Sequence, residues 1–114
     1  MNNEINTAVH YGARVVWIIL NDAQLGLNEH GMRALGMRPV ETQFPRTDFV
    51  AFAKSQGADG VAVSRADGLR AALRTALSAG KPFVVDVTIA RSGPSPVVAD
   101  RIAMVQRQSA GARA

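Results

Sequence analysis

Four consecutive residues, Asn21-Asp22-Ala23-Gln24, place an amide, a carboxylate and turned backbone carbonyls directly after a run of apolar residues. Such groups are hard oxygen donors, which Mg²⁺ binds while it keeps other positions for water or phosphate oxygens. The same residues are typical of a turn, because Asn and Asp side chains accept hydrogen bonds from their own downstream backbone. Spacing alone therefore indicates either a metal-binding loop or a simple turn.

The elements around this segment predict an α/β fold. Residues 15–20 are apolar and rich in β-branched types, which predicts a strand covered on both faces near the centre of a parallel sheet. Further strands are expected around Val61 and Val63 and over 83–89. Helices are expected over 3–11, 27–35 and 48–56, and another begins after Ser64 and ends at Gly80. This alternation predicts an open parallel sheet with flanking helices. Ligands bind at the carboxyl ends of strands in such sheets, where Asn21 to Gln24 falls.

Several local signals fix the expected helix ends. Thr47 or Asp48 is suited to cap the helix that ends before Gly57. Another helix should bury residues spaced by three and four, namely Leu69, Leu73, Ala76 and Leu77. Beyond residue 90, positions 92–96 predict a break, positions 100–108 a short helix and positions 109–114 a tail of small residues.

Composition narrows the class of protein. A chain of 114 residues with 47% hydrophobic content is expected to form one domain. It has no cysteine, so disulfides, thiolate metal sites and cysteine nucleophiles are excluded. The longest apolar run is too short to span a membrane and no signal peptide is apparent, which predicts a cytoplasmic protein. The net charge of +4 comes mostly from scattered arginines after residue 89, without aromatic residues, so nucleic-acid binding is not expected.

Three segments in succession carry a family resemblance: Glu-Ile-Asn-Thr-Ala-Val-His-Tyr-Gly at 4–12, the apolar strand, and Asn-Asp-Ala-Gln-Leu-Gly-Leu at 21–27. Their order resembles the thiamine diphosphate-binding signature of acetolactate synthase-like enzymes. The similarity extends through Asp48-Phe49-Val50, Gly57-Ala58 and Val84-Val85-Asp86-Val87. It implies a three-layer α/β/α cofactor-binding fold, present in part, with residues 1–90 as the carboxyl-terminal part of that domain and 91–114 as a tail.

The resemblance also implies roles for individual residues. In the family, the second residue of an Asn-Asn or Asn-Asp pair binds Mg²⁺ through its side chain, and the residue two further on binds it through its carbonyl. Those positions are Asp22 and Gln24 here. The metal joins the diphosphate of the cofactor to the protein. Asn21 is expected to orient the loop, and Leu25, Gly26 and Leu27 to run beside the cofactor and the substrate pocket.

Two parts of the family pattern are absent from this sequence. The Gly-Asp-Gly triplet, whose aspartate is the other metal ligand, does not occur, and neither does the domain that carries the catalytic glutamate. We therefore expect an amino-terminally truncated chain, inactive by itself and without a catalytic residue. The resemblance implies that the complete enzyme decarboxylates or ligates a 2-oxo acid such as pyruvate and forms a homo-oligomer. The alternative is a non-catalytic α/β binding or dimerisation domain without a metal.

Other polar residues have ordinary structural explanations. His30 is more often a packed or solvated histidine than a metal ligand or an acid–base catalyst. Asp86 lies within an apolar strand, where a carboxylate is expected to face a helix amino terminus or neighbouring amides. Arg33, Arg38 and Arg46 can attract an anionic substrate, although a solvated surface is the simpler interpretation.

Overall fold

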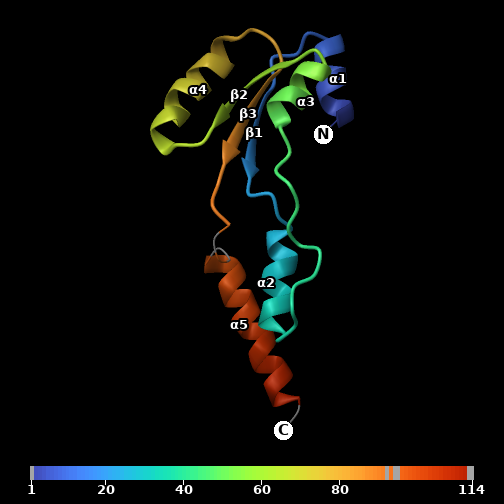
Figure 1. The fold of residues 1–114 in the computed structure, drawn as a ribbon, viewed down its shortest axis with the longest axis vertical. Helices are drawn as coiled ribbons and strands as arrows, with labels where there is room; N and C mark the ends of the chain where they lie inside the picture. The colour runs from blue at the N-terminus through green and yellow to red at the C-terminus, as the bar shows by residue number, and fades with distance from the viewer. Residues whose placement is uncertain (1, 92, 94–95, 113–114) are drawn as a thin grey trace. The chain divides into compact units, whose positions relative to one another are not determined.

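The computed structural model describes residues 2–91, 93 and 96–112, and the chain divides into two compact units. The sheet unit comprises Met1–Asn21 and Arg46–Ile89, and the helical unit comprises Asp22–Pro45 and Ala90–Ala114. The elements, labelled in Figure 1, are α1 (Asn2–His10), β1 (Val16–Asn21), α2 (Gly26–Ala34), α3 (Phe49–Ser55), β2 (Asp59–Val63), α4 (Ala66–Ser78), β3 (Phe83–Thr88) and α5 (Pro96–Gly111).

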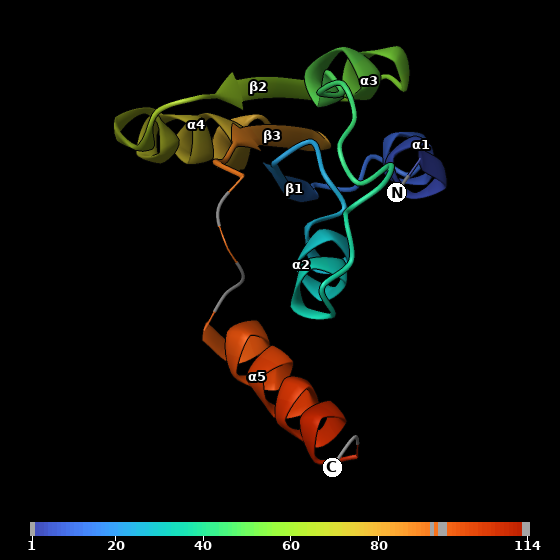
Figure 2. The same cartoon turned by 60° about the horizontal axis from the view of Figure 1, so that its bottom comes forward.

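The sheet unit contains three parallel strands in the order β1-β3-β2, as seen in Figure 2. The predicted parallel α/β fold is therefore confirmed. The central position predicted for β1 is wrong among the described strands, because β3 lies in the middle and β1 at an edge. Ile18 and Leu20 of β1 are 54% and 65% exposed, whereas four successive residues of β3 are buried. A continuous apolar run predicts a buried strand, but it does not say how many strands pair with it.

Helices cover both faces of this sheet, as Figure 1 shows for α4 on one side and α1 and α3 on the other. Phe83 and Val85 of β3 pack with Ala72 and Ala76 of α4. Val84, between them in sequence, packs on the opposite face with residues of α1 and α3. Successive side chains of a strand point to opposite faces, so one apolar strand supplies two cores. The result is the predicted three-layer arrangement.

The ends of α3 follow local sequence signals. Asp48 is the amino-terminal cap of α3, where its side chain accepts a hydrogen bond of 2.8 Å from the amide of Ala51. Gly57, at φ +87°, follows this helix in the conformation that favours glycine.

The buried face of α4 differs from the prediction at one position. The predicted burial of Leu77 is wrong, since it is 76% exposed and Ala72 is buried instead. Both positions fit a helical repeat, and the smaller side chain faces the sheet.

In the helical unit, α2 and α5 pack against each other, and the connection 35–45 follows α2. α5 runs from Pro96 to Gly111, longer than the helix predicted over 100–108. Proline suits the first turn of a helix, and the Ala- and Gln-containing sequence that follows favours its continuation. Positions 92, 94 and 95 of the predicted break and 113–114 of the predicted tail lie outside the described residues. No helix in the described part is long and apolar enough to cross a membrane.

Candidate functional site

Asn21, the last residue of β1, is held by several hydrogen bonds within the sheet unit. Its side-chain amide is buried and donates to the Thr47 carbonyl at 3.0 Å and to Asp86 Oδ1 at 3.0 Å. Its backbone carbonyl accepts from the guanidinium of Arg46 and, at 3.1 Å, from the amide of Ile89. Every polar group named here has a partner in the protein, and these contacts fix the end of β1.

The next three residues form a tight turn at the start of the helical unit. The amide of Gln24 donates to Asp22 Oδ1 at 3.3 Å, which is the local bond expected of a simple turn. Ala23 between them is buried and has φ +55°, a value that residues other than glycine rarely adopt. The bond occupies one oxygen of the Asp22 carboxylate, and no hydrogen bond from the described residues reaches the other.

The carbonyls of this turn differ in their hydrogen bonding. The Ala23 carbonyl accepts from the amide of Phe44 at 3.2 Å, and the amide of Leu25 donates to the Thr42 carbonyl at 2.7 Å. These two bonds pair Gln24 with Gln43 in an isolated antiparallel bridge. In the described part of the chain, no hydrogen bond reaches the Gln24 carbonyl itself. An unpaired carbonyl is the kind of group that a cation can use as a ligand.

Gly26 opens α2 directly beside the two side chains of the turn. A Cβ built on Gly26 would lie 3.5 Å from Asp22 Oδ2 and 3.3 Å from Gln24 Nε2. The absence of a side chain therefore keeps space open next to the carboxylate. Leu25 and Leu27 on either side are 49% and 69% exposed. The six candidate residues are all those from Asn21 to Leu27 except Ala23. They lie between the end of β1 and the first turn of α2.

The oxygen ligands in the turn fit a cation that also binds water or phosphate oxygens. Asp22 offers a carboxylate oxygen and Gln24 an open carbonyl, both hard oxygen ligands of the type that Mg²⁺ prefers. Among the described residues there is no group of three or more His, Cys, Asp or Glu that could hold a metal. Mg²⁺ commonly takes only one or two protein carboxylates together with phosphate and water oxygens, so this limited set remains compatible with it.

Glu29 of α2 is the centre of a hydrogen-bond network in the helical unit. It is 7% exposed, and its carboxylate accepts from Arg33 Nη2 at 3.0 Å, Thr42 Oγ1 at 3.0 Å and Gln43 Nε2 at 3.3 Å. The hydrogen bonds from Arg33, Gln43 and Thr42 hold the pKa of the Glu29 carboxyl below its ordinary value, and the bond from Arg33 has the largest effect. These bonds join α2 to the segment that pairs with the turn.

Acid should weaken this network. Because the pKa of Glu29 is lowered in the folded chain, its contribution to stability is complete above the ordinary value of 4.5 and is lost as the pH falls below that value. Amide resonances of residues 24–44 are expected to shift together as the pH is lowered from neutral to well below 4.5. Glu29→Gln should remove this response, whereas the exposed Glu41→Gln should retain it. An unchanged response in Glu29→Gln would show that other carboxylates cause it.

Arg91 is a site residue that the sequence analysis did not single out. Its guanidinium donates to the carbonyls of Asp22, Ala23 and Phe44 and to the side chain of Gln43. A cavity of about 530 Å³ in the helical unit is lined by polar residues that include Gln24, Glu29, His30, Arg33, Gln43 and Arg91. Two features of the sequence could have indicated these residues. Glu29 and Arg33 have the i, i+4 spacing of an ion pair on a helix, and Arg91 lies just beyond the carboxyl end of a strand.

The remaining candidates mostly have the structural explanations expected. Asp86 accepts from the Asn21 amide and, at 3.4 Å, from the amide of Phe49, the first residue of α3. Its predicted position facing a helix amino terminus is confirmed. Arg33 pairs with Glu29 and Arg46 with the Asn21 carbonyl, while Arg38 is exposed. All three arginines are exposed, which matches the interpretation of a solvated surface, although Arg33 and Arg46 also make the contacts named here.

The sequence of this chain matches the model of a known protein family. The model of the C-terminal TPP binding domain of thiamine pyrophosphate enzymes matches residues 1–87. The chain belongs to this family, as its resemblance predicted. The match includes β1, the turn after it, α2 and β3 as far as Val87, and therefore all of residues 21–27.

Curated relatives agree with this assignment. The chain is 37% identical over 93 residues, 82% of its length, to YdaP of Bacillus subtilis, named as a thiamine pyrophosphate-containing protein. It is 37% identical over 87 residues, 75% of its length, to IlvB2 of Mycobacterium tuberculosis, named as an acetolactate synthase large subunit. An acetolactate synthase of Bacillus subtilis is 29% identical over 87% of the chain. The chain spans only 16–17% of the length of these relatives.

Proposed function

We propose that this chain supplies the loop that binds the diphosphate of thiamine diphosphate through Mg²⁺. The observation that carries this proposal is the turn after β1, where a carboxylate oxygen of Asp22 and the Gln24 carbonyl have no protein donor among the described residues. Asp22 would bind the cation through its side chain and Gln24 through its backbone. Asn21 orients the end of the strand, and the exposed Leu25 and Leu27, with Gly26, offer a surface beside the cofactor.

The proposed reaction of the whole protein follows from its family. Bound thiamine diphosphate would supply the nucleophilic carbon for decarboxylation or carboligation of a 2-oxo acid such as pyruvate. Residues 1–90 would contribute the diphosphate-binding part, without a catalytic side chain of their own. We further propose that the whole protein assembles as a homo-oligomer; the exposed apolar residues Ile18 and Leu20 of β1 support a surface that further protein covers. Sedimentation of the whole protein should give the mass of two or more subunits, and the mass of a single subunit would contradict this assembly.

Paramagnetic Mn²⁺, used in place of Mg²⁺, tests the metal loop directly. Amide resonances of residues 22–26 in the ¹⁵N-labelled chain are expected to broaden first, and excess Mg²⁺ should reverse the effect. Thiamine diphosphate should strengthen metal binding, because its phosphate oxygens fill positions that water otherwise holds. Even weak binding is measurable in this way.

A pair of aspartate variants locates the site. Asp22→Ala should raise the Mn²⁺ dissociation constant by more than about tenfold, the lower limit for residues that merely orient ligands. Asp100→Ala removes the same charge from an exposed position on α5 and should leave binding unchanged. Broadening that begins elsewhere, or that persists unchanged in Asp22→Ala, would contradict the proposal and favour a binding domain without this metal.

A further inference from the structure

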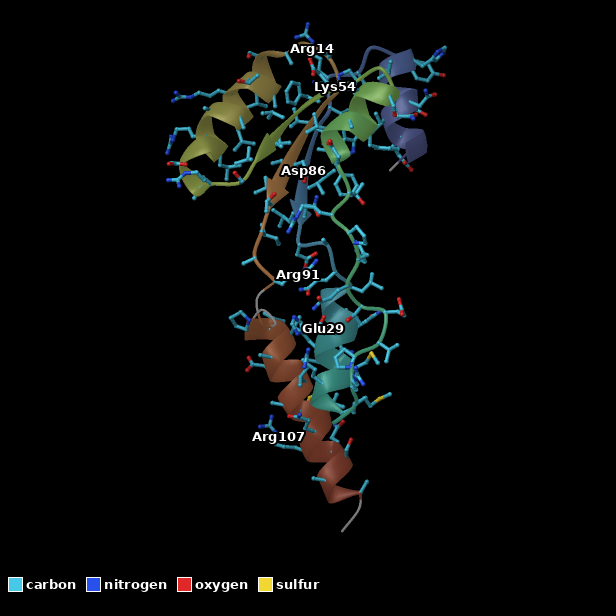
Figure 3. All side chains as sticks on the ribbon, viewed as in Figure 1. Arg14, Glu29, Lys54, Asp86, Arg91 and Arg107 are labelled. Carbon is cyan, nitrogen blue, oxygen red and sulfur yellow. The ribbon has the colours of Figure 1, made fainter. Side chains whose placement is uncertain are left out.

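The contacts of Arg91, labelled in Figure 3, converge on the turn that precedes α2. Nε donates to the Asp22 carbonyl at 3.0 Å, and Nη2 donates to the carbonyls of Ala23 at 3.3 Å and Phe44 at 3.4 Å. Nη1 donates to Gln43 Oε1 at 3.1 Å. One side chain therefore holds two carbonyls of the turn and two groups of the segment paired with it.

Every one of these acceptors is uncharged. Within the described residues Arg91 makes no ion pair, so its positive charge is not neutralised by a carboxylate. The guanidinium contributes through geometry instead, since its rigid fork of donors reaches several acceptors at once. A lysine ammonium could not make the same set of bonds.

The two carbonyls in the turn are those that define the conformation of Ala23. The Asp22 carbonyl belongs to the peptide group before Ala23, and the Ala23 carbonyl belongs to the peptide group after it. Bonds from Arg91 to both therefore fix φ and ψ of Ala23, which has the uncommon φ of +55°. A strained backbone of this kind persists only where surrounding contacts hold it. With these carbonyls occupied, the next one, of Gln24, receives no hydrogen bond from a residue that the structure describes.

Arg91 is itself held in place through α2. Gln43 accepts from Arg91 with Oε1 and donates to Glu29 with Nε2, so its side-chain amide is used at both ends. Glu29 is fixed in turn by Arg33 and Thr42. The turn is thus joined to a helix through a continuous chain of hydrogen bonds.

We propose that Arg91 is a positioning residue that holds the Asp22–Gln24 turn in its metal-binding shape, a role that rests on the proposed function of that turn. It acts through the backbone of the turn and through the segment paired with it. Outer residues that orient ligands commonly change metal affinity by about 10- to 100-fold when they are replaced.

Arg91→Met tests this role, because a positioning role and a purely electrostatic role predict opposite changes in the Mn²⁺ dissociation constant. If Arg91 acted through its charge alone, its removal from the neighbourhood of a cation would tighten metal binding. The positioning role predicts the opposite, a Mn²⁺ dissociation constant raised by about tenfold or more in the line-broadening titration. Arg107→Met is the matched control, because Arg107 lies exposed on α5 and makes no hydrogen bond or ion pair with described residues. Unchanged or tighter binding in Arg91→Met would overturn the proposal.

Hydrogen exchange separates this proposal from the proposed function. In the metal-free chain, Arg91→Met should accelerate exchange at the amides of Leu25 and Phe44, which bond across the turn. If the wild-type loop does not bind Mn²⁺, the proposed function fails, whatever the exchange shows. If it binds but affinity and exchange are unaltered in the variant, only the role of Arg91 fails. Should Arg91→Met disturb the sheet resonances, Arg91→Lys decides: it keeps the charge, and an unchanged dissociation constant would overturn the positioning role.

Discussion

Asp86→Leu is expected to destabilise the sheet unit by about 2–3 kcal/mol. The substitution removes the acceptor for the buried Asn21 amide at 3.0 Å and for the Phe49 amide at 3.4 Å. A buried donor that loses its partner costs about 1–3 kcal/mol. The Asn21 amide keeps its bond to the Thr47 carbonyl, which limits the loss. Urea unfolding of the chain, followed by resonances of β3, measures the change.

A conservative variant separates hydrogen bonding from packing at this position. Asp86→Asn keeps the size of the side chain and one acceptor oxygen, so it should lose about 1 kcal/mol, the value of a single hydrogen bond. It should also retain the native resonances of Asn21 and Thr47. If Asp86→Leu proved as stable as the wild type, the buried carboxylate would contribute nothing to folding, and its presence would need a functional reason.

Gly60→Ala is expected to cost about 3 kcal/mol, the upper part of the usual range for overpacking a core. A Cβ on this residue of β2 would lie 2.9 Å from the carbonyl oxygen of Val84 and 3.5 Å from the Cα of Val50. The distance to Val50 is an ordinary contact, whereas the distance to Val84 is too short. The Val84 oxygen is a backbone atom of the central strand, so it cannot move without shifting β2 relative to β3.

Gly68→Ala in α4 is the matched control. Its added methyl would meet Val63 Cγ1 at 3.8 Å, an ordinary contact, and alanine favours a helix over glycine by about 0.8–1 kcal/mol. We expect Gly68→Ala to be neutral or slightly stabilising in the same urea experiment. Equal effects of the two substitutions would show that the close approach of Gly60 to Val84 does not constrain the pairing of β2 with β3.

Local patterns in the sequence were enough for most of the secondary structure and for the position of the candidate loop. Apolar runs, helical spacing and residues such as Asp48 and Gly57 act within a few positions of the chain. Their effects therefore depend little on what packs around them. The order of strand, polar turn and helix at 16–34 follows in the same way, as does the family to which the loop belongs.

Contacts between distant parts of the chain required the tertiary structure. Asn21 and Asp86 are 65 positions apart, and the register that places them together is set when β1 pairs with β3. The same pairing makes β3 the central strand and leaves Ile18 exposed, which a continuous apolar run does not reveal. Strand order depends on which surfaces meet, whereas periodicity records only which faces are buried.

The sequence by itself determined the types of ligand at the candidate site, an aspartate side chain and a carbonyl two residues further on. Only the tertiary structure decided which backbone carbonyls of the turn accept a hydrogen bond from the protein and which do not. The Ala23 carbonyl is taken by Phe44 and Arg91, and the Gln24 carbonyl is left without a donor among the described residues. The reason is physical: a residue's chemistry is local, but hydrogen-bond partners 21 and 68 positions away are supplied by the fold.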